Sequence, residues 1–525
     1  MSPWPKDNAN VSSAISAYIP TRVEFAVFVS GVVSMGLEIV AGRQLAPTFG
    51  SSVYTWGSII GVFLAALAVG YWLAGRRAAR RASEGALGAV FIGAALYVGL
   101  LLVFGDPLLG AADALALPPR LAPIVPITIL FGPPTVLLGF ISPYGAELVE
   151  SQSAGDASGR VYALGTAGSI LGAFATTFVL VPAVGVVGIE FAYGLLLLGT
   201  AAVVVPRRAR ATWAALAVVT VCLFGAYAVA GAGLGAGNVV YETQTQYQQL
   251  QVVDDGDVRT LYLDDVPHSA MDRTDPDRYV FEYTRYFHLS MLAADDVDRV
   301  LFVGGGGFSG PKRFAREYNA TVDVVELDPA VIRTAKRYFG VRESDDLQIH
   351  NGDGREYLET TNRTYDIVIL DAYRADRAPI HLTTVEFMQL VSDRMDDDGV
   401  VVGNVISARS GPQSAFYRAQ YRTMDRVFPQ VYSFPTSERS GVQNIELLAT
   451  NSPERLSQAA FAERNRQRSI GIDLAREIGF YQDDVSVGDA PLLTDDFAPV
   501  DSLLARQVDT EYVIERTDNE SVATP

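Results

Sequence analysis

Long apolar runs dominate the first half of the chain. Each has about the ~20 residues that an α-helix needs to cross a bilayer, and charged residues are rare within them. The runs lie near residues 23–42, 54–74, 87–105, 121–142, 160–181, 185–205 and 212–233. A buried soluble bundle would not repeat charge-free, small-residue stretches so often. We therefore expect residues 21–235 to form a transmembrane domain of about seven helices, preceded by a polar tail over residues 1–20.

Arginines crowd two loops of this domain, one between the second and third runs and one between the sixth and seventh. They are Arg76, Arg77, Arg80 and Arg81 in the first loop and Arg207, Arg208 and Arg210 in the second. The positive-inside rule places both loops in the cytoplasm. Seven spans then put the C-terminal half on the extracytoplasmic side of the cell membrane. Four Asn-X-Ser/Thr sequons (Asn10, Asn319, Asn362 and Asn519) are compatible with that side but occur often by chance.

Individual residues within the runs add three expectations. Glu38 lies inside the first run, where a carboxylate is either functional or paired with a polar neighbour on another span. The fifth run carries small residues at the spacing that allows close helix packing, namely Gly165, Gly168 and Gly172. Gly132-Pro133-Pro134 is expected to break the fourth run.

The second half changes to strand and helix periodicities. Residues 239–265 alternate like strands around a turn at Asp255-Gly256, and residues 278–292 have the pattern of an amphipathic helix, which together predict a β-rich subdomain over 236–298. Short apolar strands then alternate with helical stretches over 299–450 and predict an α/β Rossmann-like domain with a parallel sheet. The strands are expected at 300–303, 322–325, 347–350, 366–370 and 400–405, with hairpin-like runs near 431–434 and 445–449. Residues 451–525 would form a C-terminal extension.

A glycine-rich turn organises this second half. Gly304 to Gly307 follow the strand at 300–303, and Pro311 suits the first turn of the next helix. Glu326 comes twenty residues after Gly306, at the end of the following strand. In a βαβ nucleotide site such an acid accepts hydrogen bonds from ribose hydroxyls, so the stretch predicts nucleotide-type binding.

Three acids follow three strands, and the carboxyl ends of parallel strands are where ligands bind. Glu326 fits a ribose diol and Asp353 an adenine amine. Asp371 follows an apolar strand, where burial would raise its pKa and suit a general base or a cation anchor. The structural alternatives are a turn-forming role for Asp353 and a helix cap for Asp371.

The composition limits the classes of partner that the protein is expected to bind. The chain has a net charge of −18 and only three lysines, and the acidic excess lies in the second half. This composition suits a high-salt habitat and argues against nucleic-acid binding. The single Cys222 and four scattered histidines imply no metal site.

These residues resemble the spermidine synthase (polyamine aminopropyltransferase) family over roughly 240–450. The matching segments are Tyr247-Gln248, Leu263-Asp264-Asp265, VLFVGGGG at 300–307, Val325-Glu326-Leu327-Asp328, Gly352-Asp353-Gly354 and the strand that ends in Asp371. With its apolar first half and the segment at 493–501, the chain looks like the membrane-fused branch of that family, from a halophilic archaeon.

The resemblance implies a methyltransferase-like sheet and decarboxylated S-adenosylmethionine, or S-adenosylmethionine, as donor. An aminopropyl group would pass to a polyamine, with Asp371 deprotonating the attacking amine. The implied donor contacts are Gln248, Gly304, Gly305, Gly306, Glu326, Asp353 and Gly354, and the implied acceptor contacts are Tyr279, Glu282 and Arg374. The expected partners are the lipid bilayer, a small-molecule acceptor and, as a candidate homodimer, a second copy of the chain.

Two positions depart from the family pattern. Gly307 and Arg374 stand where family members usually carry acids, and an arginine three residues after Asp371 repels a cationic acceptor. If the acceptor is a polyamine, Glu282 or Asp376 is expected to supply the missing negative charge. Two alternatives therefore stay open: an S-adenosylmethionine-dependent methyltransferase with a neutral or anionic acceptor, and a non-catalytic ligand-binding or transport-associated membrane protein.

Overall fold

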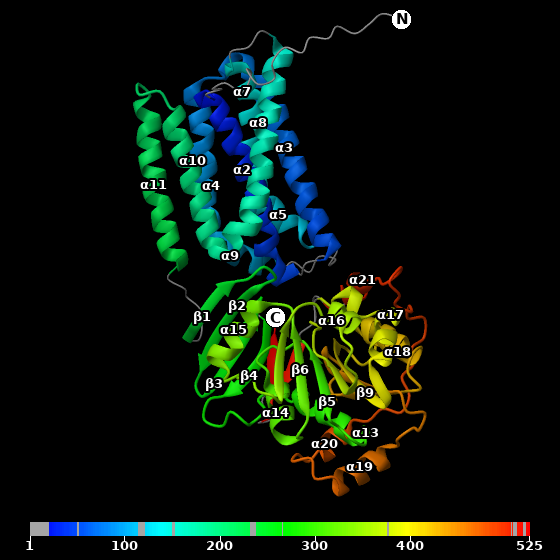
Figure 1. Cartoon of the computed structure of the whole chain (residues 1–525). Helices are drawn as coiled ribbons and strands as arrows, with labels where there is room; N and C mark the ends of the chain where they lie inside the picture. Colours follow the sequence, from blue (N-terminus) through cyan, green and yellow to red (C-terminus); the bar gives the residue numbers. More distant parts are fainter. Residues whose placement is uncertain are drawn as a thin grey trace, which may run out of the picture.

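The chain forms a helical bundle up to Gly231 and a globular α/β part from Asn238 onward, as Figure 1 shows. The computed structural model describes residues 20–49, 52–113, 121–149, 153–231, 238–264, 266–374, 377–505, 507, 512–517 and 521–524. The polar tail expected over residues 1–20 lies outside the described residues, apart from Pro20.

Six helices of the bundle are long and apolar enough to cross a membrane, and a pair of helices bent by 52° would make a seventh crossing. The helices are α2 (Arg22–Phe49), α3 (Val53–Arg81), α4 (Glu84–Asp113), α5 (Ile124–Leu130), α6 (Gly132–Gly139), α7 (Ile141–Leu148), α8 (Ala154–Ala175) continued by the π-helical η1 (Thr176–Leu180) and α9 (Val181–Ala183), α10 (Val186–Val204) and α11 (Arg210–Gly231). The bend falls between α5 and α6, where two prolines begin α6 and cannot donate backbone hydrogen bonds. The predicted break in the fourth run is confirmed.

Helices α2 and α8 pack backbone against backbone. A Cβ on Gly168 would lie 2.0 Å from the carbonyl oxygen of Phe28, and a Cβ on Gly172 would lie 2.3 Å from that of Val32. Larger residues would push the helices apart, so the close packing predicted from the glycine spacing is confirmed.

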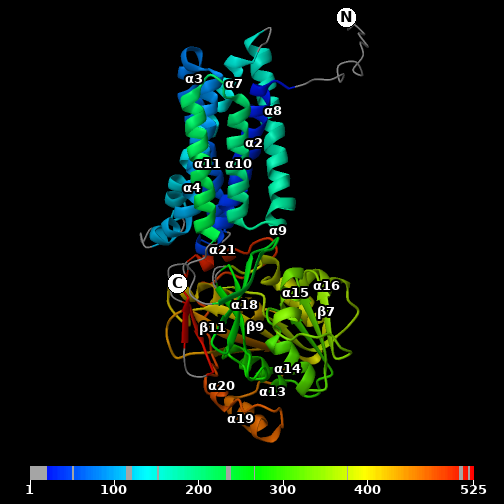
Figure 2. The ribbon, with the colours of Figure 1, turned by 90° about the vertical axis from the view of Figure 1, so that its left-hand side faces the viewer.

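Successive helices alternate in direction, which separates the two ends of the bundle (Figures 1 and 2). Near the globular part, Gly105 of α4 faces the side chain of Gln44 of α2. At the far end, Gly145 of α7 faces Val27 of α2, and Gly88 of α4 faces Val205. The bent pair therefore runs the height of the bundle, and the arginine-rich loops after α3 and α10 lie at the end away from the globular part.

The β-rich subdomain is a four-stranded antiparallel sheet in sequence order. Its strands are β1 (Asn238–Gln244), β2 (Gln249–Asp255), β3 (Val258–Leu263) and β4 (Val266–Asp272). Gly256 has a φ of +56° in the turn predicted between β2 and β3. The helix expected over 278–292 is shorter and broken, since Tyr279 and Phe281 form β-bridges; only α12 (Tyr283–Tyr286), η2 (Phe287–Leu289) and α13 (Ser290–Ala293) are helical.

The central sheet has seven strands in the order β10-β11-β9-β8-β5-β6-β7. They are β5 (Arg299–Val303), β6 (Thr321–Glu326), β7 (Leu347–Asn351), β8 (Tyr365–Leu370), β9 (Met395–Ser407), β10 (Gln430–Pro435) and β11 (Gln443–Thr450). The five strands from β7 to β9 are parallel, whereas β10 and β11 form the predicted hairpin and pair antiparallel to β9. The sheet is thus mixed rather than parallel throughout, and its order is that of a Rossmann-like, methyltransferase-type fold.

Helices cover both faces of this sheet. They are α14 (Ser309–Glu317), α15 (Pro329–Tyr338), α16 (Gly354–Thr360), α17 (Val385–Asp393) and α18 (Ala415–Asp425), with 3₁₀ turns η3 (Ile380–Leu382) and η4 (Pro412–Ser414). The C-terminal region adds α19 (Gln458–Gln467), α20 (Ala475–Gly479), α21 (Val500–Leu504), β12 (Tyr512–Glu515) and β13 (Ser521–Thr524). Phe461 and Ile514 join the core of one face and Leu503 the core of the other, so this region packs into the α/β domain.

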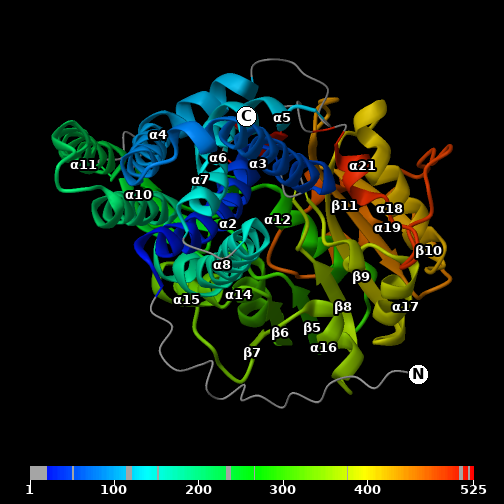
Figure 3. The ribbon, with the colours of Figure 1, turned by 90° about the horizontal axis from the view of Figure 1, so that it is seen from above.

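The bundle meets the globular part through the ends of α2 and α3. Arg43 of α2 donates a hydrogen bond to the carbonyl oxygen of Thr245, and the hydroxyls of Tyr54 in α3 and Ser502 in α21 lie 3.1 Å apart. Viewed along the helices, α2 and α3 lie over the globular part, whereas α11 stands to one side (Figure 3).

Candidate active site

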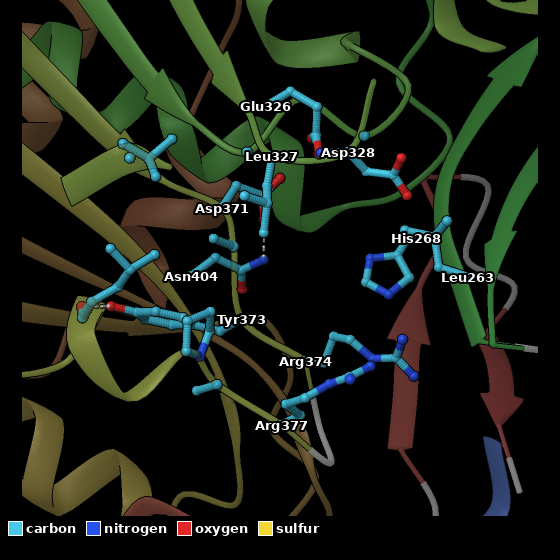
Figure 4. Close-up of a pocket in the computed structure, with 18 of the residues that line it drawn as sticks. Leu263, His268, Glu326, Leu327, Asp328, Asp371, Tyr373, Arg374, Arg377 and Asn404 are labelled. Carbon is cyan, nitrogen blue, oxygen red and sulfur yellow. Dashed lines mark hydrogen bonds between the residues drawn. The ribbon is translucent and has the colours of Figure 1, made fainter. Parts of the chain in front are cut away.

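A cavity of about 480 Å³ lies between the carboxyl ends of β5, β6, β7 and β8 and the β-rich subdomain (Figure 4). Eight of the residues singled out from the sequence line it: Gln248, Gly304, Gly306, Glu326, Asp353, Gly354, Asp371 and Arg374. The topology therefore brings together the glycine-rich turn, the three acids at strand ends and the arginine that departs from the family pattern.

The glycine-rich turn needs glycine for two different reasons. Gly304 has a φ of +98°, and a Cβ there would lie 2.2 Å from the carbonyl oxygen of Asp371. Gly305 does not line the cavity, but its N–H donates to the Glu326 carboxylate. The Gly307 N–H donates to Ser269 Oγ at 2.9 Å, and a Cβ at 307 would lie 2.8 Å from Ser269 Cβ. Ser269 of β4 thus occupies the space that an acidic side chain at 307 would need.

Glu326 is the last residue of β6, and backbone N–H groups hold its carboxylate in place. Its two oxygens accept from the N–H groups of Gly305 and Asp328, both at 2.9 Å. Burial raises the pKa of Glu326, while these backbone hydrogen bonds oppose the rise. Because each carboxylate oxygen has a second acceptor site, Glu326 can still accept hydrogen bonds from a diol.

Asp353 is the N-cap of α16. One oxygen accepts from the N–H groups of Arg355 and Glu356, and the other accepts from or pairs with His381 Nε2 at 2.8 Å. Burial opposes ionisation of Asp353, but the hydrogen bonds from the Glu356 amide and the His381 ring prevail and lower its pKa. These contacts leave acceptor capacity for one further donor, such as an adenine amine.

Asp371 follows β8 and stands in a chain of hydrogen bonds. Burial raises its pKa to about 6, although a hydrogen bond from Asn404 Nδ2 (2.8 Å) opposes the rise. Asn444 Nδ2 donates to Asn404 Oδ1 at 2.8 Å, and the hydroxyl of Tyr512 donates to Asn444 Oδ1 at 2.9 Å. The helix-cap alternative is wrong for Asp371, since residues 371–374 form no helix.

Glu446 lies in β11 directly opposite Asn404 in the β9–β11 pairing. It is fully buried, and neither carboxylate oxygen has a hydrogen-bond partner among the described residues. Burial raises the pKa of Glu446 well above its ordinary value, and the charge of Asp371 raises it further. Burial and the neighbouring Asp371 thus both favour the protonated form of Glu446.

Arg374 is buried and points along the cavity wall together with Arg377 (Figure 4). Asp264 Oδ2 accepts from Arg374 at 3.0 Å and from Arg377 at 3.2 Å, while its other oxygen accepts from the N–H of Gln249. Of the two acids expected to supply negative charge to a polyamine, Glu282 does not line the cavity and Asp376 lies outside the described residues, whereas Arg374 pairs with Asp264.

Two residues expected to contact the acceptor do not face the cavity. The Tyr279 hydroxyl is hydrogen-bonded to His288 Nε2 at 2.7 Å, and Glu282 pairs with Arg476 at 3.1 Å. Both side chains are buried, because the segment before α12 consists of turns and isolated β-bridges that direct them into the protein core. Neither is placed to hold an acceptor in this structure.

The cavity also contains polar residues that sequence reasoning missed, namely His268, Tyr283, Arg377, His381, Asn404, Asn444 and Tyr512. Most come from the subdomain, the hairpin or the C-terminal region, which the motif pattern does not connect to the site. The asparagine in the apolar strand β9 was a readable signal, because a lone amide in a buried strand needs a partner. Among the described residues no three His, Cys, Asp or Glu side chains gather as a metal site would require.

Comparisons with known proteins agree on the type of domain. Residues 281–434 match the family model described as "Spermine/spermidine synthase domain". The polyamine aminopropyltransferase of Vibrio vulnificus is 29% identical over 282 residues, which cover 51% of this chain and 93% of that protein. That of Korarchaeum cryptofilum is 32% identical over 131 residues, covering 24% of this chain and 40% of that protein.

A crystal structure of a probable spermidine synthase from Corynebacterium glutamicum superposes with a TM-score of 0.42 and 20% identity, covering 50% of this chain and 98% of the other. Residues 281–434 are thus similar to a spermine/spermidine synthase domain, and the matched relatives support a transferase enzyme.

Proposed function

We propose that the protein is a membrane-anchored aminopropyltransferase that uses decarboxylated S-adenosylmethionine as donor and a primary amine of the polyamine class as acceptor. The observation that carries the proposal is Asp371, a buried acid with a pKa of about 6 at the wall of a cavity that also contains Glu326 and Asp353. The curated relatives are named for the same type of transfer.

Asp371 supplies the base. An alkylammonium has a pKa near ~10, so proton transfer to an ordinary aspartate is strongly unfavourable. Raising the pKa of Asp371 to about 6 reduces this cost by up to about 3 kcal/mol. The hydrogen bond from Asn404 fixes one carboxylate oxygen, which leaves the other oxygen to take the proton.

The donor fits the residues at the strand ends. Glu326 can hold a ribose diol, Asp353 an adenine amine, and the turn at Gly304 and Gly306 admits the ligand against the backbone. The bound donor supplies an electrophilic carbon next to a sulfonium. The protein's own residues orient the donor, hold the acceptor amine at Asp371 and receive its proton.

We place the globular part outside the cytoplasm. The arginine-rich loops, with Arg80 in one and Arg208 in the other, lie at the opposite end of the bundle, and the positive-inside rule assigns that end to the cytoplasm. The acidic, lysine-poor composition supports a halophilic source, and the long apolar helices support a membrane-fused branch of the family.

Arg374 favours a second candidate. A buried guanidinium three residues from Asp371 suits a neutral or anionic acceptor, which a methyltransferase using S-adenosylmethionine could serve. The two candidates differ in which carbon of the donor reacts.

The experiment is a transfer assay on the purified full chain with decarboxylated S-adenosylmethionine and putrescine, in which release of methylthioadenosine is followed. Wild type should release it only when the amine is present, and Asp371→Asn should lose nearly all of this release. Equal release by Asp371→Asn would remove Asp371 from the mechanism.

A further inference from the structure

The cavity lies on the face of the globular part that touches the bundle. Arg43 at the end of α2 donates to the carbonyl oxygen of Thr245, in the same loop as the cavity residues Tyr247 and Gln248. Asp501, another cavity residue, accepts from the N–H of Val53 at the start of α3, at 3.4 Å. Two walls of the cavity are thus tied to the ends of the apolar helices that adjoin the globular part (Figure 2).

The apolar surface of the globular part gathers on this face. Among its described residues, the large apolar side chains that remain exposed are Val239, Val240, Tyr247, Leu327, Ile380 and Phe497. Three of them line the cavity, two lie in β1, which contacts α9, and the last lies just before α21, which contacts α3. Exposed apolar side chains beside membrane helices indicate contact with the interfacial layer of lipid.

Guanidinium groups gather at the same end of the cavity. Arg374 and Arg377 share Asp264, and Arg43 lies close enough to interact electrostatically with both Asp264 and Arg377. Figure 4 shows the side chains of Arg374 and Arg377 next to each other, extending in the direction of His268. Guanidinium groups match the geometry of phosphate, and at a bilayer surface the nearest phosphates belong to lipid headgroups.

We propose that this site also transfers an aminopropyl group to the headgroup amine of an aminophospholipid in the adjoining leaflet. This inference rests on the proposed aminopropyl transfer. The headgroup amine would lie at Asp371, its phosphate at Arg374 and Arg377, and its acyl chains would leave past Tyr247 toward the ends of α2 and α3. Arg374, which stands in place of the usual acid, would then bind the phosphate, because this acceptor carries a negative charge next to its amine.

The step balances without a further reactant. The headgroup nitrogen forms a bond to the propyl carbon that is attached to sulfur, as the bond between that carbon and sulfur breaks. The electron pair of the broken bond stays on sulfur, which leaves as a neutral thioether. The ammonium proton goes to Asp371 and from there to solvent.

The test uses the full chain in phosphatidylcholine vesicles, with decarboxylated S-adenosylmethionine in the medium. One sample contains phosphatidylethanolamine in the same vesicles, a second contains soluble phosphoethanolamine, and a third contains putrescine. Mass spectrometry of each acceptor measures aminopropyl addition. We expect modified phosphatidylethanolamine, formed faster than modified phosphoethanolamine at the same total concentration.

Arg377→Gln separates recognition from folding. It should lower transfer to phosphatidylethanolamine about tenfold, the loss of one charge-assisted hydrogen bond, and raise transfer to putrescine, because a like charge has left the site. An equal loss toward both acceptors would make Arg377 merely structural and overturn its assignment as a phosphate ligand.

The three acceptor samples distinguish failure of the lipid acceptor from failure of the proposed aminopropyl transfer. Modified putrescine with unmodified phosphatidylethanolamine would overturn the lipid acceptor and leave aminopropyl transfer intact. Phosphoethanolamine modified as fast as the lipid would overturn the membrane source of the acceptor. No modified amine in any sample would overturn the proposed function itself.

Discussion

The hydrogen bond from Asn404 to Asp371 makes a quantitative prediction about the pH dependence of transfer. Asn404→Leu keeps the size of the side chain but removes the donor that stabilises the ionised form of Asp371. A hydrogen bond to a charged group contributes ~1.5–3 kcal/mol, equivalent to about 1–2 pKa units. The pKa of Asp371 should therefore rise from about 6 in wild type to ~7–8 in the variant.

Other groups around Asp371 should not obscure this shift. Tyr283 and Tyr512 have raised pKa values, so they stay uncharged while Asp371 titrates, and burial opposes ionisation of Glu446. The assay is the pH dependence of kcat/KM for methylthioadenosine release. Its acid limb should move to higher pH, with a loss of ~8-fold near pH 6.5 for a shift of ~1.5 units and convergence with wild type at high pH.

The neighbouring asparagine provides the matched control. Asn444→Leu removes the second link of the chain but leaves the donor on Asp371, so it should shift the limb much less than Asn404→Leu. An acid limb that stays at the wild-type position in Asn404→Leu, or moves to lower pH, would refute the assigned role of this hydrogen bond.

Three further predictions follow from the same structure. Asp371→Asn should stabilise the protein above pH ~6 by ~1–3 kcal/mol. The reason is that wild type loses stability as pH rises from ~4 to ~6, since the folded protein raises the pKa of this carboxyl to about 6. Thermal unfolding of wild type and variant in detergent at pH 4 and pH 8 measures this difference, and a destabilised variant at pH 8 would contradict it. Glu326→Ala should weaken binding of an adenosyl ligand by ~1.5–3 kcal/mol in calorimetry. Glu326→Gln, which keeps one acceptor oxygen for the Gly305 or Asp328 amide, should lose less; equal affinity in wild type and the alanine variant would exclude a ribose contact. A reporter fused to the C-terminus should give an extracytoplasmic signal, and a cytoplasmic signal would reverse the assigned orientation.

The parts of the site that could be predicted from sequence lie within the βαβ repeat. Glu326 and Asp371 follow apolar strands, and parallel strands must bring their carboxyl ends to one edge of the sheet. Asn404 and Tyr512 could not be placed in this way, because their contacts depend on β11 pairing antiparallel to β9 and on the C-terminal region packing back onto the sheet.

The sequence pattern likewise could not predict ion pairs between residues far apart in the chain. Arg374 was singled out from the sequence, but Asp264, with which it pairs, belongs to the β-rich subdomain. Tyr279 and Glu282 were expected at the acceptor from the family resemblance; the turns and isolated β-bridges found there direct them toward His288 and Arg476 instead. Local periodicity does not determine which side of a chain segment faces a ligand.

The mass of the modified acceptor, measured after incubating the full chain with decarboxylated S-adenosylmethionine and a primary amine, tests the central claim most directly. Aminopropyl transfer predicts an acceptor enlarged by one aminopropyl group, with methylthioadenosine released in equal amount and no product from Asp371→Asn. A methylated acceptor, or a donor that stays intact in the presence of putrescine and phosphatidylethanolamine alike, would contradict it.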